Sequence, residues 1–354
     1  MFLVESYFVA ILFCFITMLC WGSWANTQKL AGKTWRYELF YWDYVFGVVL
    51  MSLVFALTLG NQGTLGRGFF ADLAQAEMAP MLSAFIGGVV FNVANILLVA
   101  AIAIAGMAVA FPVGIGLALV LGVLINFITE TDPAKSGDPV LVFSGVALVA
   151  LAIILNALAY RKIPGQQTGV STKGLGLSVA CGILMSLFYF FVKQALAGVV
   201  PADGGAPNSL VTAATLATGT LEAGKLTPYT ANMIFALGIL ASNFIVNTAV
   251  MMKPFVGEPV PVMNYFRGFF RDHVWGLVGG GIWSVGMALN IMAAGVASAA
   301  IAYGLGQGAT LVSAIWGVFI WREFRTAPAG TNKLLAAMFL CFVAGLGLLI
   351  FAKM

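Results

Sequence analysis

Residues 303–317 read "YGLGQGATLVSAIWG" and lie inside a long apolar segment, although they include four glycines and a glutamine. In a helix interior, each glycine costs about 1 kcal/mol relative to alanine. A glutamine side chain in hydrocarbon needs hydrogen-bond partners, because burying an unpaired amide is unfavourable. The stretch therefore predicts a membrane helix whose weak points serve close packing or contact with a ligand.

The composition of the whole chain supports a membrane location. Of its 354 residues, 61% are hydrophobic and 8% are charged, whereas soluble domains carry about 25% charged residues. The net charge of +4 is small and does not indicate a nucleic-acid partner. All four cysteines lie in apolar segments, so we expect them to pack without forming a disulfide framework. The expected partners are the lipid bilayer and a small-molecule substrate, and the sequence leaves a monomer or a homodimer open.

The fold class that we predict is an all-α polytopic membrane protein. A spanning helix needs about 20 apolar residues, and ten segments qualify: 7–28, 38–59, 81–103, 105–128, 139–159, 174–197, 229–251, 274–294, 297–320 and 334–352. A polar linker at residues 161–173 divides the chain into residues 1–160 and residues 174–354. Five spans fall on each side of this linker.

The basic residues predict the orientation. Ten spans place both termini on one side of the membrane and the linker on the other. The linker side carries twelve of the 17 basic residues: Lys29, Lys33, Arg36, Arg161, Lys162, Lys173, Lys253, Arg267, Arg271, Arg322, Arg325 and Lys333. The positive-inside rule then makes the linker cytoplasmic and both termini external. We expect this orientation in a bacterial inner membrane.

Two connections are long enough to have structure of their own. Residues 201–228 are rich in Gly, Ala and Thr, a composition that predicts a flexible outer loop. Residues 253–273 combine aromatic side chains with Arg267 and Arg271. That pattern is typical of a segment at the lipid headgroups, although an ordinary loop is an equal alternative.

Short matches between the two halves predict an internal repeat. "GGVVFNVAN" (87–95) parallels "GGGIWSVGM" (279–287), and "GVLI" (122–125) parallels "GVFI" (317–320), in the same order. Because five spans is an odd number, the two five-helix repeats would be inverted relative to each other. Secondary transporters often have this plan, with the substrate at the midplane near interrupted helices.

Helix-breaking residues occur at matching places in the two halves. Proline removes a backbone donor from a helix, and glycine allows close approach of a backbone or a ligand. The candidate breaks are Pro112, Gly114, Gly116, Gly304, Gly306 and Gly308. Of these, Gly304 and Gly308 form a ridge suited to helix packing, whereas Gly306 is expected to leave room for a ligand.

Polar and aromatic residues near these breaks are the candidate substrate site. Amides, hydroxyls and aromatic faces suit a neutral polar solute such as a sugar or a planar heterocycle. The candidates are Trp21, Trp24, Asn92, Asn95, Phe111, Trp283, Asn290, Tyr303, Gln307 and Thr310. The alternatives are an interfacial aromatic belt for the two N-terminal tryptophans, helix joining for the asparagines, and plain packing for the phenylalanine.

Three ionisable residues near or within spans are candidates for coupling or gating. An acid within the membrane indicates function by default, so Asp43 is a candidate proton carrier. A salt bridge from Asp43 to Lys29, Lys33 or Arg36 is the equal alternative. Lys29 and Lys193 are candidate gating charges, or side chains that reach the interface.

Motifs for soluble chemistry are lacking. "AGKTW" (31–35) contains Gly-Lys-Thr, but Thr27 occupies the place of the first glycine of a phosphate-binding loop. The chain has one histidine and no HExxH motif. We therefore expect no enzymatic activity, no metal site and no cofactor. A proton gradient is the expected energy source, and sodium remains open.

Four motifs in order resemble the drug/metabolite transporter superfamily: "GGVVFNVANILL", "GMAVAFPVGIG", "WGLVGGGIWSVGMALN" and "YGLGQGATLVSAIWGVFIWREFR". The chain is most similar to the branch of glucose/ribose porters, the rhamnose–proton symporter and plant ureide permeases. This resemblance implies ten helices in two inverted halves, with central uptake of a sugar or ureide-like solute, often with a proton. Asn95 and Asp43 stand where similar positions carry Asn and Asp, whereas Met287 departs from the expected polar residue.

The leading hypothesis is a proton-coupled secondary transporter of a small neutral polar solute, with a sugar first. The alternatives are a ureide or nucleobase permease, or an exporter of metabolites or drugs. A non-transporting scaffold is disfavoured, because it has no need of matched helix breaks.

Overall fold

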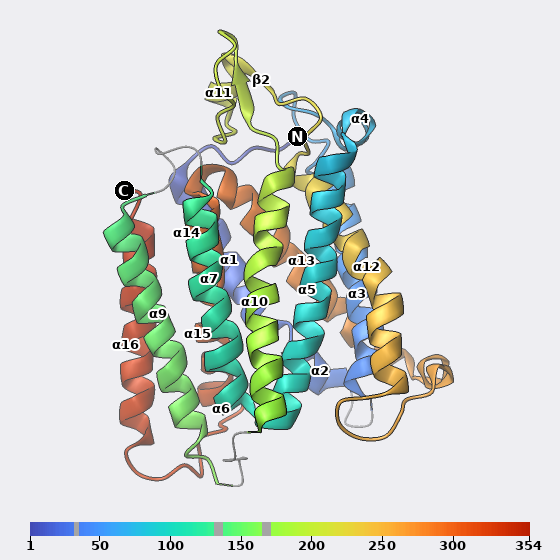
Figure 1. Cartoon of the computed structure of the whole chain (residues 1–354), viewed down its shortest axis with the longest axis vertical. Coiled ribbons are helices and arrows are strands. Elements are labelled where there is room, and N and C mark those ends of the chain that lie inside the picture. The colour runs from blue at the N-terminus through green and yellow to red at the C-terminus, as the bar shows by residue number, and fades with distance from the viewer. Residues whose placement is uncertain (32–34, 131–136, 165–170) are drawn as a thin grey trace.

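The computed structural model describes residues 1–31, 35–130, 137–164 and 171–354, and its helices form one bundle (Figure 1). Within these residues, ten helices are long and apolar enough to cross a membrane, which confirms the ten predicted spans. They are Tyr7–Ala31, Tyr37–Leu57, Met78–Ala105, Phe111–Ile128, Pro139–Tyr160, Thr172–Ala195, Pro228–Met252, Phe270–Ala297, Ala299–Ile320 and Thr331–Phe351. The chain is thus an all-α polytopic integral membrane protein.

Seven spans are single helices: α3 (Tyr37–Leu57), α5 (Met78–Ala105), α9 (Pro139–Tyr160), α10 (Thr172–Ala195), α12 (Pro228–Met252), α13 (Phe270–Ala297) and α16 (Thr331–Phe351). The other three are divided. The first consists of α1 (Tyr7–Ser23) and α2 (Asn26–Ala31). The fourth is preceded by α6 (Met107–Ala110) and consists of the π-helical turn η1 (Phe111–Ile115) and α7 (Gly116–Ile128). The ninth consists of α14 (Ala299–Gly306), α15 (Ala309–Ile315) and the π-helical turn η3 (Trp316–Ile320).

Polar residues at the ends of the apolar segments define where several spans begin. Ser6, Asp138, Ser171 and Thr227 each accept a hydrogen bond from a backbone amide in the first turn of α1, α9, α10 and α12, respectively. Proline follows the cap in α9 and α12, where its missing amide hydrogen costs nothing. Local capping therefore agrees with hydropathy about the helix starts.

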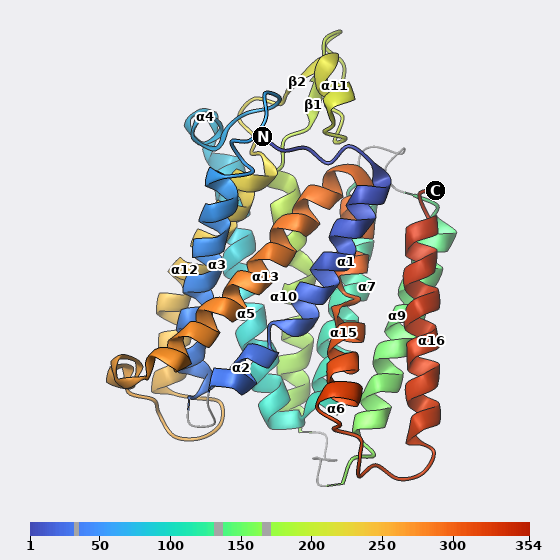
Figure 2. The same cartoon turned by 180° about the vertical axis from the view of Figure 1, so that it is seen from behind.

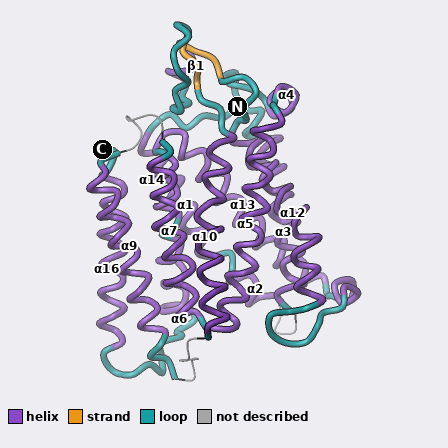
Figure 3. Tube along the Cα trace, viewed as in Figure 1, coloured by secondary structure: helices purple, strands orange, loops and turns teal. Residues whose placement is uncertain are grey.

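The two ends of the bundle differ. Both termini, α4 (Phe69–Gln75), α11 (Ala213–Ala217) and the strands β1 (Val199–Pro201) and β2 (Gly219–Leu221) lie at one end, which we call the terminal end (Figures 1 and 3). The opposite end, which we call the linker end, holds α2 and the connection that contains the 3₁₀ turn η2 (Val262–Arg267). The structure thus places the two long connections, 201–228 and 253–273, at opposite ends of the bundle, because one span, α12, lies between them.

The 201–228 segment is more structured than its composition predicts. Its strands β1 and β2 pair antiparallel. Arg67 anchors the segment, because its guanidinium binds the Asp72 carboxylate at 2.8 Å and the Lys225 carbonyl at 2.8 Å. The other oxygen of Asp72 accepts the amide of Thr227 at 2.8 Å. A buried ion pair thus holds a segment that the sequence predicts to be flexible.

Helix packing depends on close backbone approach. Helix α13 crosses the bundle between α1 and α3 (Figure 2), and α5 packs against α10 and α12. Gly280 on α13 faces the carbonyl oxygen of Tyr44 on α3, and Gly88 on α5 faces that of Phe235 on α12. A Cβ at either glycine would overlap the facing oxygen. Small residues at such contacts are typical of membrane helix interfaces.

Two connections between spans consist of a single residue. Gly106 joins α5 to α6 with φ +74°, and Ser298 joins α13 to α14 with φ +92°. Glycine adopts this left-handed region freely, whereas it is uncommon for serine. The Ser298 hydroxyl accepts the amide of Ile301 at 3.3 Å and so caps α14. Both connections are therefore tight turns, but the joined spans diverge, because α10 packs against both α5 and α7 and α1 packs against both α13 and α15.

Glycine packing can be tested with neighbouring residues. We expect Gly280→Ala to destabilise the protein by about 1–3 kcal/mol through overpacking. Gly281→Ala is the matched control, because its Cβ would meet only the flexible end of Met51 at 3.6 Å. Thermal unfolding in detergent should show a lower midpoint for the first variant alone. Equal midpoints would contradict the close approach of α13 and α3.

The orientation remains a prediction with a simple measurement. Asp203→Cys at the terminal end and Met263→Cys at the linker end both replace exposed side chains. If the basic residues set the orientation, an impermeant thiol reagent added to intact cells should label Asp203→Cys and spare Met263→Cys until the membrane is broken. The opposite pattern would reject external termini.

Candidate functional site

An aromatic cluster lies where the long helices cross. Trp283 of α13 is buried, and the centre of its ring lies 4.4 Å from the centre of the Phe91 ring on α5. Trp21 of α1 stacks on it at 5.9 Å and Phe235 of α12 at 6.1 Å. We call these four residues the Trp283 cluster. The Trp21 Nε1 donates to the Trp283 carbonyl at 3.2 Å. Trp21 therefore faces the interior of the bundle and does not belong to an interfacial aromatic belt.

A hydrogen-bonded network of amides and hydroxyls adjoins this cluster. The Tyr41 hydroxyl of α3 donates to Asn92 Oδ1 at 2.9 Å and accepts from Asn95 Nδ2 at 3.1 Å. Asn92 Nδ2 donates to Ser242 Oγ of α12 at 3.0 Å. We call these four residues the amide network. All four side chains are buried and uncharged, so the network can exchange donors and acceptors with a neutral ligand.

Tyrosine rings connect the network to the cluster. Tyr41 stacks on Tyr44 at 5.2 Å, and Tyr44 lies 6.4 Å from Trp283 and 4.6 Å from Trp24. The Tyr44 hydroxyl has no hydrogen-bond partner among the described residues. Trp24 is half-buried through this contact, so it too faces the bundle.

A second group of polar residues lies on α13, α10 and α14. Asn290 Nδ2 donates to the Ala302 carbonyl at 2.8 Å, while its Oδ1 has no partner in the described part of the chain. The Tyr189 hydroxyl donates to the Asn290 carbonyl at 3.2 Å. The Tyr303 hydroxyl lies 3.1 Å from the Met185 carbonyl. The Tyr189 and Tyr303 rings pack together at 5.4 Å.

Three predicted residues lie apart from these groups. Phe111 begins η1, which packs against α10 and α9. Gln307 is buried at the turn between α14 and α15, and the Thr310 hydroxyl donates to the Gln307 carbonyl within that turn. The Gln307 amide still donates to the Tyr303 carbonyl at 3.0 Å, so these two residues keep helical spacing, whereas the amides of Gly308 and Thr310 each donate to the carbonyl three residues earlier.

The predicted helix breaks have different surroundings. Pro112 and Gly114 lie in η1, and Gly116 begins α7. Gly306 precedes the turn at the end of α14, and its Cβ would lie 2.8 Å from Trp21 and 3.1 Å from Asn290 Nδ2. Its expected room for a ligand is therefore filled by two side chains of the candidate site.

The two glycines of the predicted packing ridge, Gly304 and Gly308, lie against neighbouring side chains. A Cβ at Gly304 would meet Leu349 and Val123 at 3.3 Å, and one at Gly308 would meet Met18 at 2.8 Å. These contacts involve side chains of α16, α7 and α1, so both positions lie at helix interfaces.

The partners of Asp43 come from distant parts of the sequence. Its carboxylate is buried near the linker end, 3.0 Å from His273 Nδ1 of α13, and it accepts a hydrogen bond from the Tyr265 hydroxyl of η2. Burial, followed by the bond to Asp43, raises the pKa of Tyr265 well above its usual value. Lys29 and Arg36 pair elsewhere, with Glu323 and Glu38. Of the salt bridges considered as the alternative for Asp43, those to Lys29 and Arg36 are not formed, and Asp43 pairs with His273 instead. Lys33 lies outside the described residues.

The two candidate lysines lie at opposite ends of the bundle. Lys29 pairs with Glu323 at 3.0 Å at the linker end, and the same carboxylate accepts the Tyr160 hydroxyl at 2.7 Å. Lys193 pairs with Glu130 at 3.4 Å at the terminal end. Each lysine thus joins helices from both halves of the chain. Within the described residues, no group of three His, Cys, Asp or Glu side chains could hold a metal ion.

Sequence reasoning missed several residues of this site. The sequence did contain a signal for Tyr41 and Tyr44: their spacing of three residues places both hydroxyls on one helix face, close in sequence to the candidate acid Asp43. Ser242 and His273 carried none that could be recognised, since each acts through a partner about 150 to 230 positions away.

Comparison with known proteins identifies the family. The sequence profile of the ureide permease family matches residues 40–168 and 171–352. This chain belongs to the ureide permease family. It is 25% identical to ureide permease 1 of Arabidopsis thaliana over 99% of this chain and 98% of that protein. It is 23% identical to probable ureide permease A3 of Vigna unguiculata over 93% of this chain and 99% of that protein.

A solved crystal structure shares the fold. It superposes with a TM-score of 0.56 and 15% identity, and covers 96% of this chain and 95% of the other. Together with the ten spans, family membership makes the chain a transmembrane transporter and not an enzyme. The ureide permease part of the predicted resemblance is confirmed, whereas the wider superfamily and the sugar-porter branch stay predictions.

The amide network can be tested by removing single hydroxyls. Tyr41→Phe leaves both Asn92 Oδ1 and Asn95 Nδ2 without this partner, so we expect a loss of about 0.5–2 kcal/mol of stability. Tyr44→Phe is the matched control, because its hydroxyl has no partner to lose among the residues that the structure describes. Thermal unfolding of both variants in detergent measures the difference. A smaller loss for Tyr41→Phe than for Tyr44→Phe would contradict the network.

Proposed function

We propose that this chain is a secondary transporter of a small, neutral, nitrogen-containing solute of the ureide or nucleobase type. The observation that carries the proposal is the uncharged amide network beside the Trp283 cluster, at the centre of a chain of the ureide permease family. The sequence alone put a sugar first and a ureide second. Relatives named as ureide permeases favour the second.

The chemistry of the network suits such a solute. A ureide or nucleobase presents N–H donors and C=O acceptors on one planar group, and a primary amide offers the complementary acceptor and donors. Aromatic rings such as Trp283 and Phe91 present flat faces on which a planar solute can stack. Binding would exchange the bonds of Asn92 and Asn95 to Tyr41 for bonds to the solute, so no buried amide is left unpaired.

The proposal includes two inverted repeats with the site between them. Support comes from corresponding residues, whose numbers differ by 192. Phe91 and Trp283 correspond, and their rings touch at 4.4 Å. Gly88 and Gly280 correspond, and each lets a span approach the second span of the opposite half. Alternating access would then move the halves around the Trp283 cluster.

We further propose that a proton drives accumulation and that Asp43 and His273 hold it. A carboxylate next to an imidazole at 3.0 Å can share a proton, and the pair joins α3 of one half to α13 of the other. Protonation would change the contact between these helices. A sodium gradient and export instead of uptake remain the alternatives. The proposal places the protein in a bacterial inner membrane with both termini outside.

Uptake by proteoliposomes tests the substrate class. We expect accumulation of a radiolabelled cyclic ureide or of uracil, driven by an imposed proton gradient, and little accumulation of glucose. Imposing a sodium gradient alone separates the two driving ions. Glucose accumulation without ureide or uracil accumulation would overturn the proposal and restore the sugar hypothesis.

The coupling role of Asp43 has its own test. Asp43→Asn cannot release a proton, so gradient-driven accumulation should fall to the level of empty liposomes while exchange of solute across the membrane continues. Glu38→Gln is the control, because it removes a carboxylate from the same helix that pairs with Arg36 and not with His273. Accumulation by Asp43→Asn at the normal level would show that the acid is structural.

A further inference from the structure

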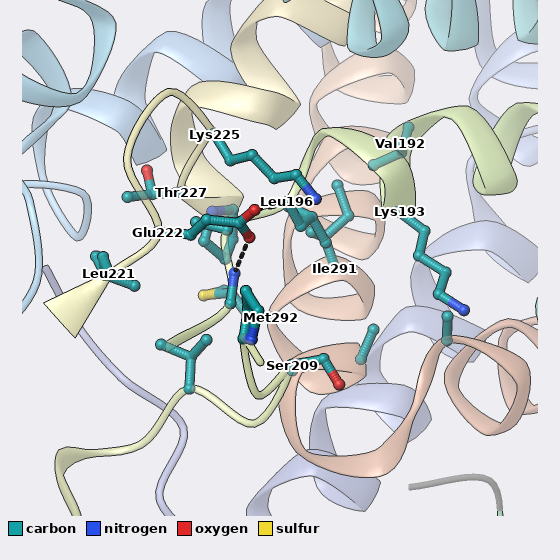
Figure 4. Close-up of a pocket in the computed structure, with 18 of the residues that line it drawn as sticks. Val192, Lys193, Leu196, Ser209, Leu221, Glu222, Lys225, Thr227, Ile291 and Met292 are labelled. Carbon is teal, nitrogen blue, oxygen red and sulfur yellow. Dashed lines mark hydrogen bonds and ion pairs between the residues drawn. The ribbon is translucent and has the colours of Figure 1, made fainter. Parts of the chain in front are cut away.

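A cavity of 440 Å³ lies at the terminal end, apart from the Trp283 cluster (Figure 4). Its walls come from α10, α13, the N-terminal segment 1–4 and the connection 206–228. Small-molecule sites have volumes of about 300–1,000 Å³, so this space can hold a solute of the proposed size. Tyr189 and Lys193 lie in its wall, but no residue of the Trp283 cluster or of the amide network does.

The charged groups of the cavity wall are arranged in pairs. Lys193 lies 3.4 Å from Glu130, with 15% and 4% of the side chains exposed, and Lys225 lies 3.6 Å from Glu222. Both pairs line the cavity. Lys193 also donates to the Asn126 carbonyl at 3.2 Å. The two pairs balance in charge, and the Met1 ammonium, which also belongs to the wall, donates to the Leu65 carbonyl at 2.7 Å. The cavity therefore suits a neutral polar solute better than an ion.

Tyr189 belongs both to this cavity and to the centre of the bundle. Its side chain lines the cavity, its ring packs on Tyr303, and its hydroxyl donates to the carbonyl of Asn290. Asn290 is buried, and its Oδ1 has no partner among the residues that the structure describes. The next residue, Ile291, lines the cavity again. Tyr189 thus contacts both the cavity and the residue whose amide oxygen has no partner within the described part of the chain.

We propose that the cavity is the terminal-side vestibule through which the solute reaches the central site, and that Tyr189 is its gate. When the Tyr189 hydroxyl leaves the Asn290 carbonyl, that carbonyl and Asn290 Oδ1 become two acceptors for the N–H groups of an entering solute. The solute class rests on the proposed function, whereas the vestibule and the gate rest on the geometry of the described residues.

Thiol reactivity tests the gate without any solute. The four native cysteines are first replaced by alanine. Gly295→Cys then reports on the vestibule, because its Cβ would meet no atom within 4 Å, and Asn290→Cys reports on the centre. With an impermeant reagent at the terminal side, Gly295→Cys should react readily and Asn290→Cys slowly. Adding Tyr189→Ala should speed labelling of Asn290→Cys by about tenfold or more, and leave Gly295→Cys nearly unchanged.

Two further variants separate the gate from a loosened helix. Phe190→Ala removes the neighbouring ring on α10, which packs on Phe191, and should not speed labelling of Asn290→Cys. Tyr189→Phe keeps the ring and removes only the hydroxyl, so it should speed labelling less than Tyr189→Ala does. An unreactive Gly295→Cys would overturn the vestibule. Rapid labelling of Asn290→Cys with Tyr189 intact, or equal effects of Phe190→Ala and Tyr189→Ala, would overturn the gate.

Labelling in the presence of solutes distinguishes a failure of the vestibule proposal from a failure of the proposed function. Uracil, a cyclic ureide and glucose are each added during labelling of Gly295→Cys, and the one that proteoliposomes accumulate should slow the reaction. If glucose alone is accumulated and protects, the ureide proposal fails and the vestibule stands. If an accumulated solute leaves the labelling rate unchanged, the cavity is not on its path and the vestibule proposal fails.

Discussion

In the hydrocarbon core of a bilayer, a buried polar group has no water with which to form a hydrogen bond, so its partner must come from another part of the protein. This constraint organises the centre of the molecule. Asn92 and Asn95 of α5 are tied to Tyr41 of α3, and Asn92 is tied to Ser242 of α12. The bonds join three helices around an uncharged site. The same constraint makes the Asn290 Oδ1 informative, because it has no partner in the described part of the chain and is therefore available to a ligand.

Charged residues lie toward the ends of the bundle, where they join its two halves. At the linker end, Asp43 binds His273 and Lys29 binds Glu323. At the terminal end, Lys193 binds Glu130. A transporter must open each end in turn, and ion pairs between the halves at each end can be broken and remade in such a cycle. Ion pairs at both ends and neutral groups at the centre therefore fit a carrier of an uncharged solute.

Hydropathy located all ten spans, because the thickness of the bilayer sets the length of each apolar segment. Composition did not foresee that Arg67 and Asp72 would hold the 201–228 segment. Amides and tryptophans in apolar segments were singled out as substrate-binding candidates, and the structure buries Asn92 and Trp283, but their role in binding stays a prediction. Long-range partners such as His273 could not be read from one sequence, because nothing local specifies them.

The central claim is that a neutral nitrogenous solute binds at the amide network beside Trp283. A density map of the protein with a bound cyclic ureide or uracil tests it most directly. The account predicts density for a planar solute within hydrogen-bond distance of Asn92 or Asn95, stacked on a ring of the Trp283 cluster. Density bound only elsewhere, with the bonds of Tyr41 to both asparagines intact, would contradict it.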